Sequence, residues 1–199
     1  MKLALLAAAA FALIATPATA HTAGEATSAP GPDSKAIALQ DGPGDVWTFS
    51  DFAVGYELAA QPAADVLRAR VTHGSNAVSV RMVFDDLQRV DTQWYRCHIR
   101  IPGRPTARFV LEAKKGHWGG TAWQELEGEW VHVPGLGHSI DYASDTVTLR
   151  VARTLLGRPS WVRVRLFNEL GLPDGSTFFT DNPRTATPHP AFTPPLPST

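Results

Sequence analysis

The chain has 199 residues, with 18 Lys and Arg against 19 Asp and Glu, 44% hydrophobic residues and a single cysteine. A net charge near zero argues against a protein that coats nucleic acid, and the hydrophobic content is too high for a mostly disordered chain. One cysteine excludes an internal disulfide framework and a zinc site built from several thiolates. We therefore expect one globular domain that folds without a cofactor.

The first twenty residues have the pattern of an export signal. A short basic start at Met1-Lys2 precedes an apolar run from Leu3 to Ala15, and Ala18-Thr19-Ala20 offers small residues to a signal peptidase. The apolar run is shorter than the roughly 20 residues that cross a membrane. Residues 1–20 are therefore predicted to be a signal peptide, and the mature protein is expected to be secreted, extracellular and free of a membrane anchor.

Two further segments are expected to lie outside the fold. Residues 21–34 are small and polar and contain Pro and Gly, which predicts a flexible leader. Residues 181–199 include six prolines, which predicts an extended, disordered tail. The folded domain is thus expected over residues 35–180.

Alternation of apolar and polar residues dominates this domain. The clearest pattern is a hairpin, in which residues 67–72 and 78–84 alternate on either side of a turn at residues 73–76. Helical signal is confined to about one turn at residues 152–157, which ends at a glycine. The fold class is therefore all-β, an antiparallel β-sandwich or jelly roll with at most one short helical turn. The other strands are expected at residues 35–39, 46–49, 93–101, 108–113, 129–133, 146–151 and 161–167.

The order of the strands carries a resemblance. Asp45-Val46, Asp65-Val66, the segment 71–74 and the segment 146–157 follow one another as in uncharacterised secreted β-sandwich proteins of high-GC Gram-positive bacteria, which the chain resembles. The strand pattern over residues 40–170 is more distantly similar to family nine carbohydrate-binding modules and DOMON domains. This resemblance implies a jelly-roll-like fold, and family nine modules grip a sugar with stacked tryptophans.

An aromatic segment at residues 116–132 is the first candidate site. Sugar-binding surfaces combine flat aromatic faces with hydrogen-bonding side chains, and glycines let the backbone approach a ligand. An alternative interpretation is a hairpin whose tryptophans fill the core. Trp118 and Trp123 would face opposite sides of a continuous strand unless Gly119-Gly120 forms a turn. The candidate ligand-binding residues of this segment are His117, Trp118, Trp123, Trp130 and His132.

Arginines at outward strand positions are the second feature. They predict a guanidinium-rich face able to bind an acidic polysaccharide, to which Arg96 and Arg100 are assigned. In the alternative interpretation the two sheets share the arginines, and acids such as Asp65, Glu112 and Asp145 neutralise them. His98 falls on the same outward side and is expected to be solvated. The nine outward arginines are Arg68, Arg70, Arg81, Arg96, Arg100, Arg108, Arg150, Arg163 and Arg165.

Metal and hydrolytic sites lack a diagnostic motif. Three histidines near one another suit zinc or copper, acidic turns suit calcium, and paired carboxylates suit a glycosidase. Since none has a recognisable spacing, we assign no catalytic residue and leave the metal unknown. The candidates are His117, His132 and His138 with Asp141; Asp141 with Asp145; Asp85 and Asp86 with Asp91; and Glu112, Glu125, Glu127 and Glu129.

These patterns together predict a secreted, monomeric, non-catalytic binding module. Its expected ligand is a carbohydrate or a cell-envelope glycan. Two alternatives stay open, an extracellular protein-interaction or inhibitor protein with a secreted protein as its partner, and an enzyme that acts on wall polymers.

Overall fold

The computed structural model describes residues 35–50, 56–173, 175–185 and 187–199. The predicted signal peptide and leader lie outside these residues. The described chain contains strands and turns and no helix, so the all-β prediction is confirmed. Residues 152–157, where a helical turn was expected, form consecutive hydrogen-bonded turns. A search of the described residues for a helix long and apolar enough to cross a membrane finds none.

The smaller sheet has five antiparallel strands in the order β1-β4-β5-β11-β10. Its centre is the predicted hairpin, in which β4 and β5 pair from Val66↔Phe84 to His73↔Val78. The strands are β1 (Lys35–Gln40), β4 (Val66–His73), β5 (Ala77–Phe84), β10 (Leu136–Asp141) and β11 (Thr146–Ala152).

The larger sheet runs β3-β2-β13-β12-β6-β7-β8-β9, with the short β14 (Leu196–Pro197) paired to β12. It includes the long β8, which the alternation did not predict because adjacent glycines interrupt the pattern. The strands are β2 (Val46–Ser50), β3 (Glu57–Ala59), β6 (Thr92–Arg100), β7 (Ala107–Lys114), β8 (His117–Leu126), β9 (Glu129–Val131), β12 (Trp161–Gly171) and β13 (Thr177–Asp181).

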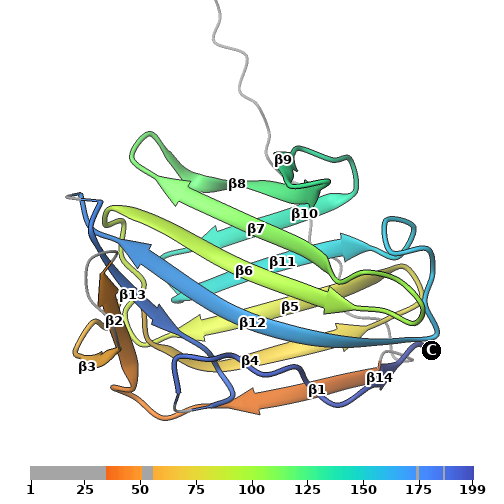
Figure 1. Ribbon diagram of the computed structural model, residues 1–199, viewed down its shortest axis with the longest axis horizontal. Coiled ribbons are helices and arrows are strands. Elements are labelled where there is room, and N and C mark those ends of the chain that lie inside the picture. Colours follow the sequence, from red (N-terminus) through yellow and green to blue (C-terminus); the bar gives the residue numbers. More distant parts are fainter. Residues whose placement is uncertain (1–34, 51–55, 174, 186) are drawn as a thin grey trace, which may run out of the picture.

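The two sheets lie face to face, and β12, β6 and β7 pass in front of the smaller sheet in Figure 1. Alternate residues of both sheets meet in one hydrophobic core. Tyr95, Cys97 and Ile99 of β6 are buried in it, whereas the residues between them face the outer side of the larger sheet. Burial raises the pKa of the Cys97 thiol to about 12, so this cysteine is an inert core residue.

The proline-rich C-terminal segment differs from the expected disordered tail. The backbone NH and the hydroxyl of Thr193 are hydrogen-bonded to the backbone of Val164 on β12. Both Thr193 and Leu196 are buried. Leu196 also pairs with Val162 and packs in the core, so these residues attach the segment to β12.

Candidate functional site

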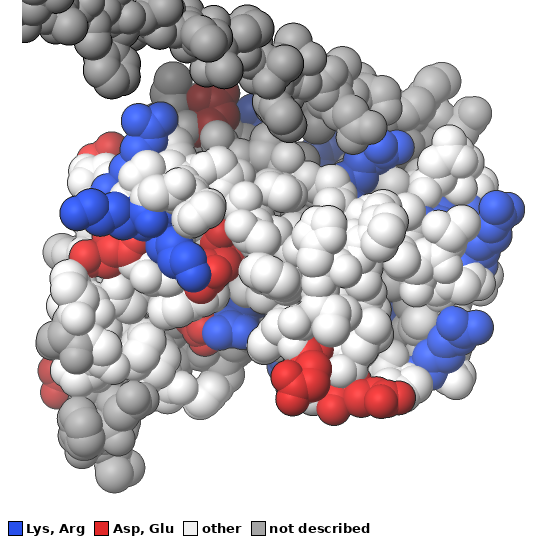
Figure 2. Space-filling view, turned by 90° about the horizontal axis from the view of Figure 1, so that it is seen from above, with Lys and Arg blue, Asp and Glu red and all other residues white. Residues whose placement is uncertain are grey.

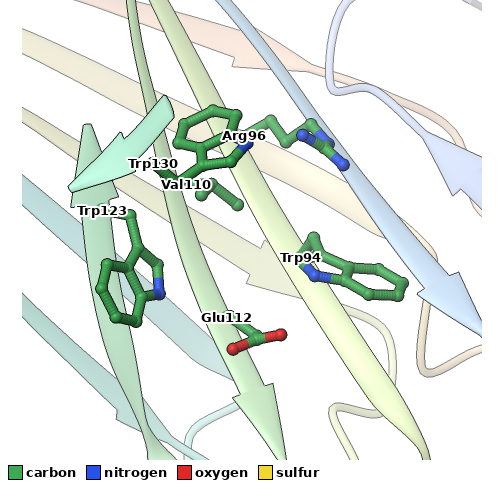
Figure 3. Close-up of a pocket in the computed structure, with 6 residues that line it drawn as sticks. All are labelled: Trp94, Arg96, Val110, Glu112, Trp123 and Trp130. Atoms are coloured by element: carbon green, nitrogen blue, oxygen red, sulfur yellow. The ribbon is translucent and has the colours of Figure 1, made fainter. Parts of the chain in front are cut away.

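A cavity lies on the outer face of the larger sheet, over β6, β7, β8 and β9. Its volume is about 250 Å³, and the lining includes three tryptophans from three different strands (Figure 3). Trp123 and Trp94 stand on either side of β7, with Glu112 between them. The residues that line the cavity are Trp94, Arg96, Val110, Glu112, Trp123 and Trp130.

The strand register brings these residues together. Trp94 lies opposite Glu112 in one row across the sheet. In the next row Arg96 lies opposite Val110, which lies opposite Trp123. Successive residues on one face of a strand are two positions apart, so the two rows are neighbours and form the floor of the cavity.

Packing of the tryptophans leaves part of each ring available. Trp94 lies against Gly171, where an added Cβ would come within 2.9 Å of its ring, and is 6.3 Å from Phe178 between ring centroids. The glycine on β12 therefore makes room for the Trp94 indole. Trp130 on the short β9 is 39% exposed, and Trp94 and Trp123 are half-buried. The three rings form walls that a ligand can reach.

Two charged side chains border the cavity, and each already has a partner. The Nε of Arg96 donates to Glu169 at 2.6 Å, and the Nζ of Lys114 lies 3.0 Å from a carboxylate oxygen of Glu112. All four side chains are partly solvent-exposed, so each pair contributes at most about 1 kcal/mol to stability. The two pairs also orient the side chains, because the partners hold the Arg96 guanidinium and the Glu112 carboxylate at the edge of the aromatic cavity. Each pair has no net charge.

The structure separates the predicted site residues into two groups. Trp123, Trp130 and Arg96 line the cavity. Trp118 does not, because its side chain packs against the core, at a part of β8 where the β7–β8 register shifts between Glu112 and Lys114. The backbone carbonyl of Trp118 accepts a hydrogen bond from the Tyr142 hydroxyl at 3.1 Å.

Three other predicted residues lie outside the cavity lining. His132 contacts the lining indirectly, since its ring meets that of Trp123 edge-on at 6.4 Å between centroids. His117 is exposed at the start of β8, opposite Lys114. The guanidinium of Arg100 lies 4.4 Å from the centre of the Phe192 ring, on the proline-rich segment.

Trp94 and Glu112 complete the cavity and were not predicted as ligand-binding residues. A signal for Trp94 was present, because it shares the outward side of β6 with Arg96 while Tyr95 faces inward. Glu112 was considered as a glycosidase acid and as an acid that neutralises the outward arginines. The sequence does not reveal the strand order, which places β6 beside β7.

The outward arginines are divided between the two sheets. Arg68, Arg70, Arg81 and Arg150 belong to the smaller sheet, and the other five belong to the larger one. On the face in Figure 2, basic and acidic side chains lie in small groups on a mostly uncharged surface. The neutralising acids differ from the expected ones, since the salt-bridge partners of Arg96 and Arg108 are Glu169 and Glu125. On the larger sheet the acids pair with only part of the group, since burial and the nearby charges of Arg108 and Arg100 lower the pKa of Arg165.

The environment of His98 differs from the solvated one that was expected. It lies on the outward side of β6 as predicted, yet it is only 8% exposed rather than solvated. Arg165 donates a hydrogen bond to its Nδ1 at 2.6 Å, and its ring meets Phe167 edge-on. Burial, reinforced by the neighbouring guanidinium of Arg165, lowers the pKa of His98 to about 4. A neutral His98 is therefore part of the packing on this face.

Three of the expected metal candidates are hydrogen-bonded to backbone groups of neighbouring segments or turns. Asp141 accepts hydrogen bonds from the backbone NH groups of Ala143 and Ser144, and Asp145 accepts one from Leu87. His138 is hydrogen-bonded to the Gly120 carbonyl. Within the described ranges, the histidines do not gather into a metal-binding group.

Comparison of the chain with protein-family models, with curated proteins and with solved structures finds no match.

Proposed function

We propose that the protein is a carbohydrate-binding module and that the cavity bordered by Trp94, Trp123 and Trp130 holds a sugar unit. The observation that carries this proposal is the convergence of three indoles from β6, β8 and β9 beside one carboxylate and one guanidinium. A sugar ring presents C–H groups on its faces and hydroxyls at its edge, so it needs both kinds of partner. Secretion, which the N-terminal sequence predicts, would bring the module to extracellular or cell-envelope glycans.

The charge arrangement favours an uncharged sugar. Glu112 is paired with Lys114, and Arg96 with Glu169, so the cavity offers hydrogen-bond acceptors and donors without an unpaired charge. Three indoles and a carboxylate also suit a quaternary ammonium group. The Glu112 carboxylate is already paired with Lys114 and is not free to neutralise such a cation, which is why a neutral glycan is the better ligand.

The size and the acid content of the cavity favour binding of a short glycan unit over hydrolysis. A volume of about 250 Å³ lies just below the roughly 300–1,000 Å³ of sites that enclose a drug-sized molecule. Glu112 is the one carboxylate among the six lining residues. Glycoside hydrolysis normally requires a second carboxylate across the bond. The lining therefore supports recognition of a single ring or a chain end.

A glycan array probed with the protein, followed by tryptophan-fluorescence titration of each positive glycan, tests the proposal. We expect Trp123→Ala and Trp130→Ala each to weaken binding by about 1–3 kcal/mol, taking as a guide the range for a nucleobase stacked on an aromatic side chain. Trp118→Phe is the matched control, because residue 118 lies on the same strand but faces the core. Absence of any glycan ligand, or an equal loss in Trp118→Phe and Trp123→Ala, would refute the assignment.

A further inference from the structure

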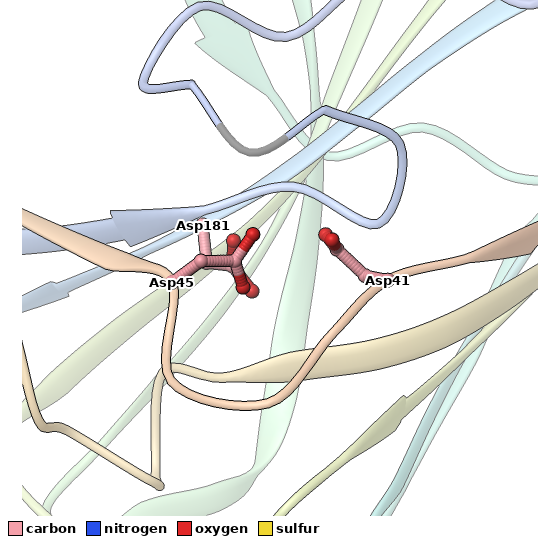
Figure 4. A group of neighbouring side chains, drawn as sticks. All are labelled: Asp41, Asp45 and Asp181. Atoms are coloured by element: carbon pink, nitrogen blue, oxygen red, sulfur yellow. The ribbon is translucent and has the colours of Figure 1, made fainter.

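Three carboxylates gather near β2 and β13, which lie on the other side of β12 from the cavity. Asp41 and Asp45 flank the turn between β1 and β2, and Asp181 is the last residue of β13. One carboxylate oxygen from each lies within 4.8 Å of the other two. Figure 4 shows the side chains of Asp45 and Asp181 directed toward that of Asp41. The cluster thus joins a strand of the smaller sheet to two strands of the larger one.

No basic side chain in the described chain forms an ion pair with this cluster. Asp181 is 1% exposed, and Asp41 and Asp45 are half-buried. Burial, with repulsion from the neighbouring carboxylates, raises the pKa of Asp41 to about 7 and that of Asp181 to about 8. Carboxylates held this close in a partly dry site are stabilised either by a proton or by a bound cation.

A fourth carboxylate, that of Asp65, lies beside the β1–β2 turn and has one oxygen without a hydrogen-bond partner. Asp65 is 3% exposed, and its Oδ2 accepts a hydrogen bond from Gly44 in the β1–β2 turn at 2.6 Å. Its Oδ1 is buried without a hydrogen-bond partner. The charge of Asp65 acts on Asp41, and that of Asp45 acts on Asp65, so its side chain lies near the cluster, although it is not one of the three carboxylates within 4.8 Å of one another.

Asn168 offers a further buried acceptor atom without a partner. Asn168 is 2% exposed and lies opposite Asp181 in the β12–β13 register. Its Nδ2 donates to the backbone carbonyl of Ala64, whereas its Oδ1 has no partner. Asp41 Oδ2 and Asp45 Oδ1 are likewise buried and unpaired. A group of buried acceptor oxygens without donors is what a bound cation would satisfy.

We propose that Asp41, Asp45 and Asp181 bind a calcium ion, with Asp65 and Asn168 as neighbouring oxygen donors. All the donor atoms are oxygens, which selects a hard cation over zinc or copper. Calcium binds oxygens at about 2.3–2.6 Å, so ligands on opposite sides of it are about 5 Å apart, in agreement with the spacing of the cluster. Magnesium usually takes only one or two carboxylates, so a site with three favours calcium.

We predict that the stability of the fold depends on the calcium concentration. The ion would tie the β1–β2 turn to the end of β13, and thus one sheet to the other. A cation that binds the folded chain and not the unfolded chain raises the unfolding temperature as its concentration rises.

Calorimetric titration of the chelator-treated full chain with calcium chloride, and in parallel with magnesium chloride, tests the proposal. We expect one calcium site, weaker magnesium binding and a rise in unfolding temperature with calcium. Asp45→Asn should weaken calcium binding by about tenfold or more, because it removes one charged ligand. The control is Asp86→Asn, since this exposed carboxylate contacts the Gln88 amide away from the cluster.

A second measurement separates a calcium ligand from a merely structural carboxylate. In chelator, Asp45→Asn should unfold at a higher temperature than the wild type because it relieves repulsion, whereas in calcium it should unfold at a lower one. Asp41→Asn should show the same reversal, and neither variant removes the hydrogen bonds that Asp181 makes to Val66 and Asn182. The proposal is overturned if the wild type binds no calcium at millimolar concentration, if magnesium binds as tightly, or if Asp86→Asn loses as much affinity as Asp45→Asn.

Discussion

His98 is expected to make the stability of the protein fall as the pH drops below neutrality. Its buried ring accepts a hydrogen bond from Arg165, and Arg108 and Arg96 add further positive charge nearby. The folded protein lowers the pKa of His98 to about 4. An unfolded histidine has a pKa of about 6.5, so between these values the unfolded chain takes up a proton that the native chain refuses.

The sign and the size of the effect follow from this difference. The contribution of a neutral His98 is fully present above about pH 6.5 and is lost as the pH falls toward 4. At 1.36 kcal/mol for each pKa unit, the full loss is about 3 kcal/mol, of which about 2 kcal/mol is reached at pH 5. Because the ring is 8% exposed, solvent screening reduces this value little.

Urea unfolding of the wild type and of His98→Asn at pH 7.5 and pH 5 measures the effect. The asparagine amide oxygen can still accept from Arg165, but it does not titrate. The comparison cancels other groups, including His73, whose pKa is also lowered by burial. We expect the free-energy difference between the two proteins to move by about 2 kcal/mol in favour of the variant at pH 5. An unchanged difference, or a His98 that titrates near pH 6.5 by NMR, would refute this reasoning.

Three further changes test the packing. Gly120→Ala should destabilise the protein by about 2–4 kcal/mol in urea unfolding, because residue 120 has a φ of 84° and a Cβ there would lie 2.5 Å from Leu111 Cδ1. Leu196→Ala should lower the free energy of unfolding by about 2–5 kcal/mol, because this buried side chain attaches the proline-rich segment to the sandwich. Pro195→Ala, at an exposed position, should change it little. Equal stability of both variants would show that the segment does not contribute to the fold. Arg108→Ala should change stability by less than about 1 kcal/mol, since its partner Glu125 forms an exposed pair with it, and a larger change in thermal unfolding would contradict this assignment.

Gly120 also explains how the two sheets close at one edge. Its carbonyl is hydrogen-bonded to His138 of β10, and the space where a Cβ would stand is bordered by Leu111 and Ile140. The sequence suggested a turn at Gly119-Gly120 as one possibility. Residue 120 instead stays within β8 and lets a strand of the other sheet approach.

Local alternation was sufficient to predict most strands and the inward side of each. Alternation places Tyr95, Cys97 and Ile99 on the side of β6 opposite Arg96 and His98, and the structure buries all three. Alternation is a property of a single strand, so it does not tell which strands are neighbours. Trp94 and Trp123 meet at one cavity only because β7 lies between β6 and β8.

The carboxylate cluster was harder to predict from the sequence than the cavity. Asp41 and Asp45 are close in the chain, but Asp181 falls in a segment that was expected to be disordered. Its position depends on β13 pairing with both β2 and β12. Acidic turns such as the one at Asp141 look similar in the sequence, yet there the backbone satisfies the carboxylate.

The two proposed sites occupy different parts of the larger sheet, and this makes their tests independent. The cavity is formed by β6 to β9, whereas the carboxylates lie at the ends of β13 and of the β1–β2 turn, with β12 between the two groups of strands. Removal of calcium should therefore lower the unfolding temperature while leaving the glycan affinity of the folded protein unchanged. Conversely, Trp123→Ala should weaken glycan binding and leave the calcium affinity intact. If chelation abolished glycan binding at a temperature where the sandwich is still folded, calcium and the glycan would share one site, and the assignment of the cavity to β6–β9 would be wrong.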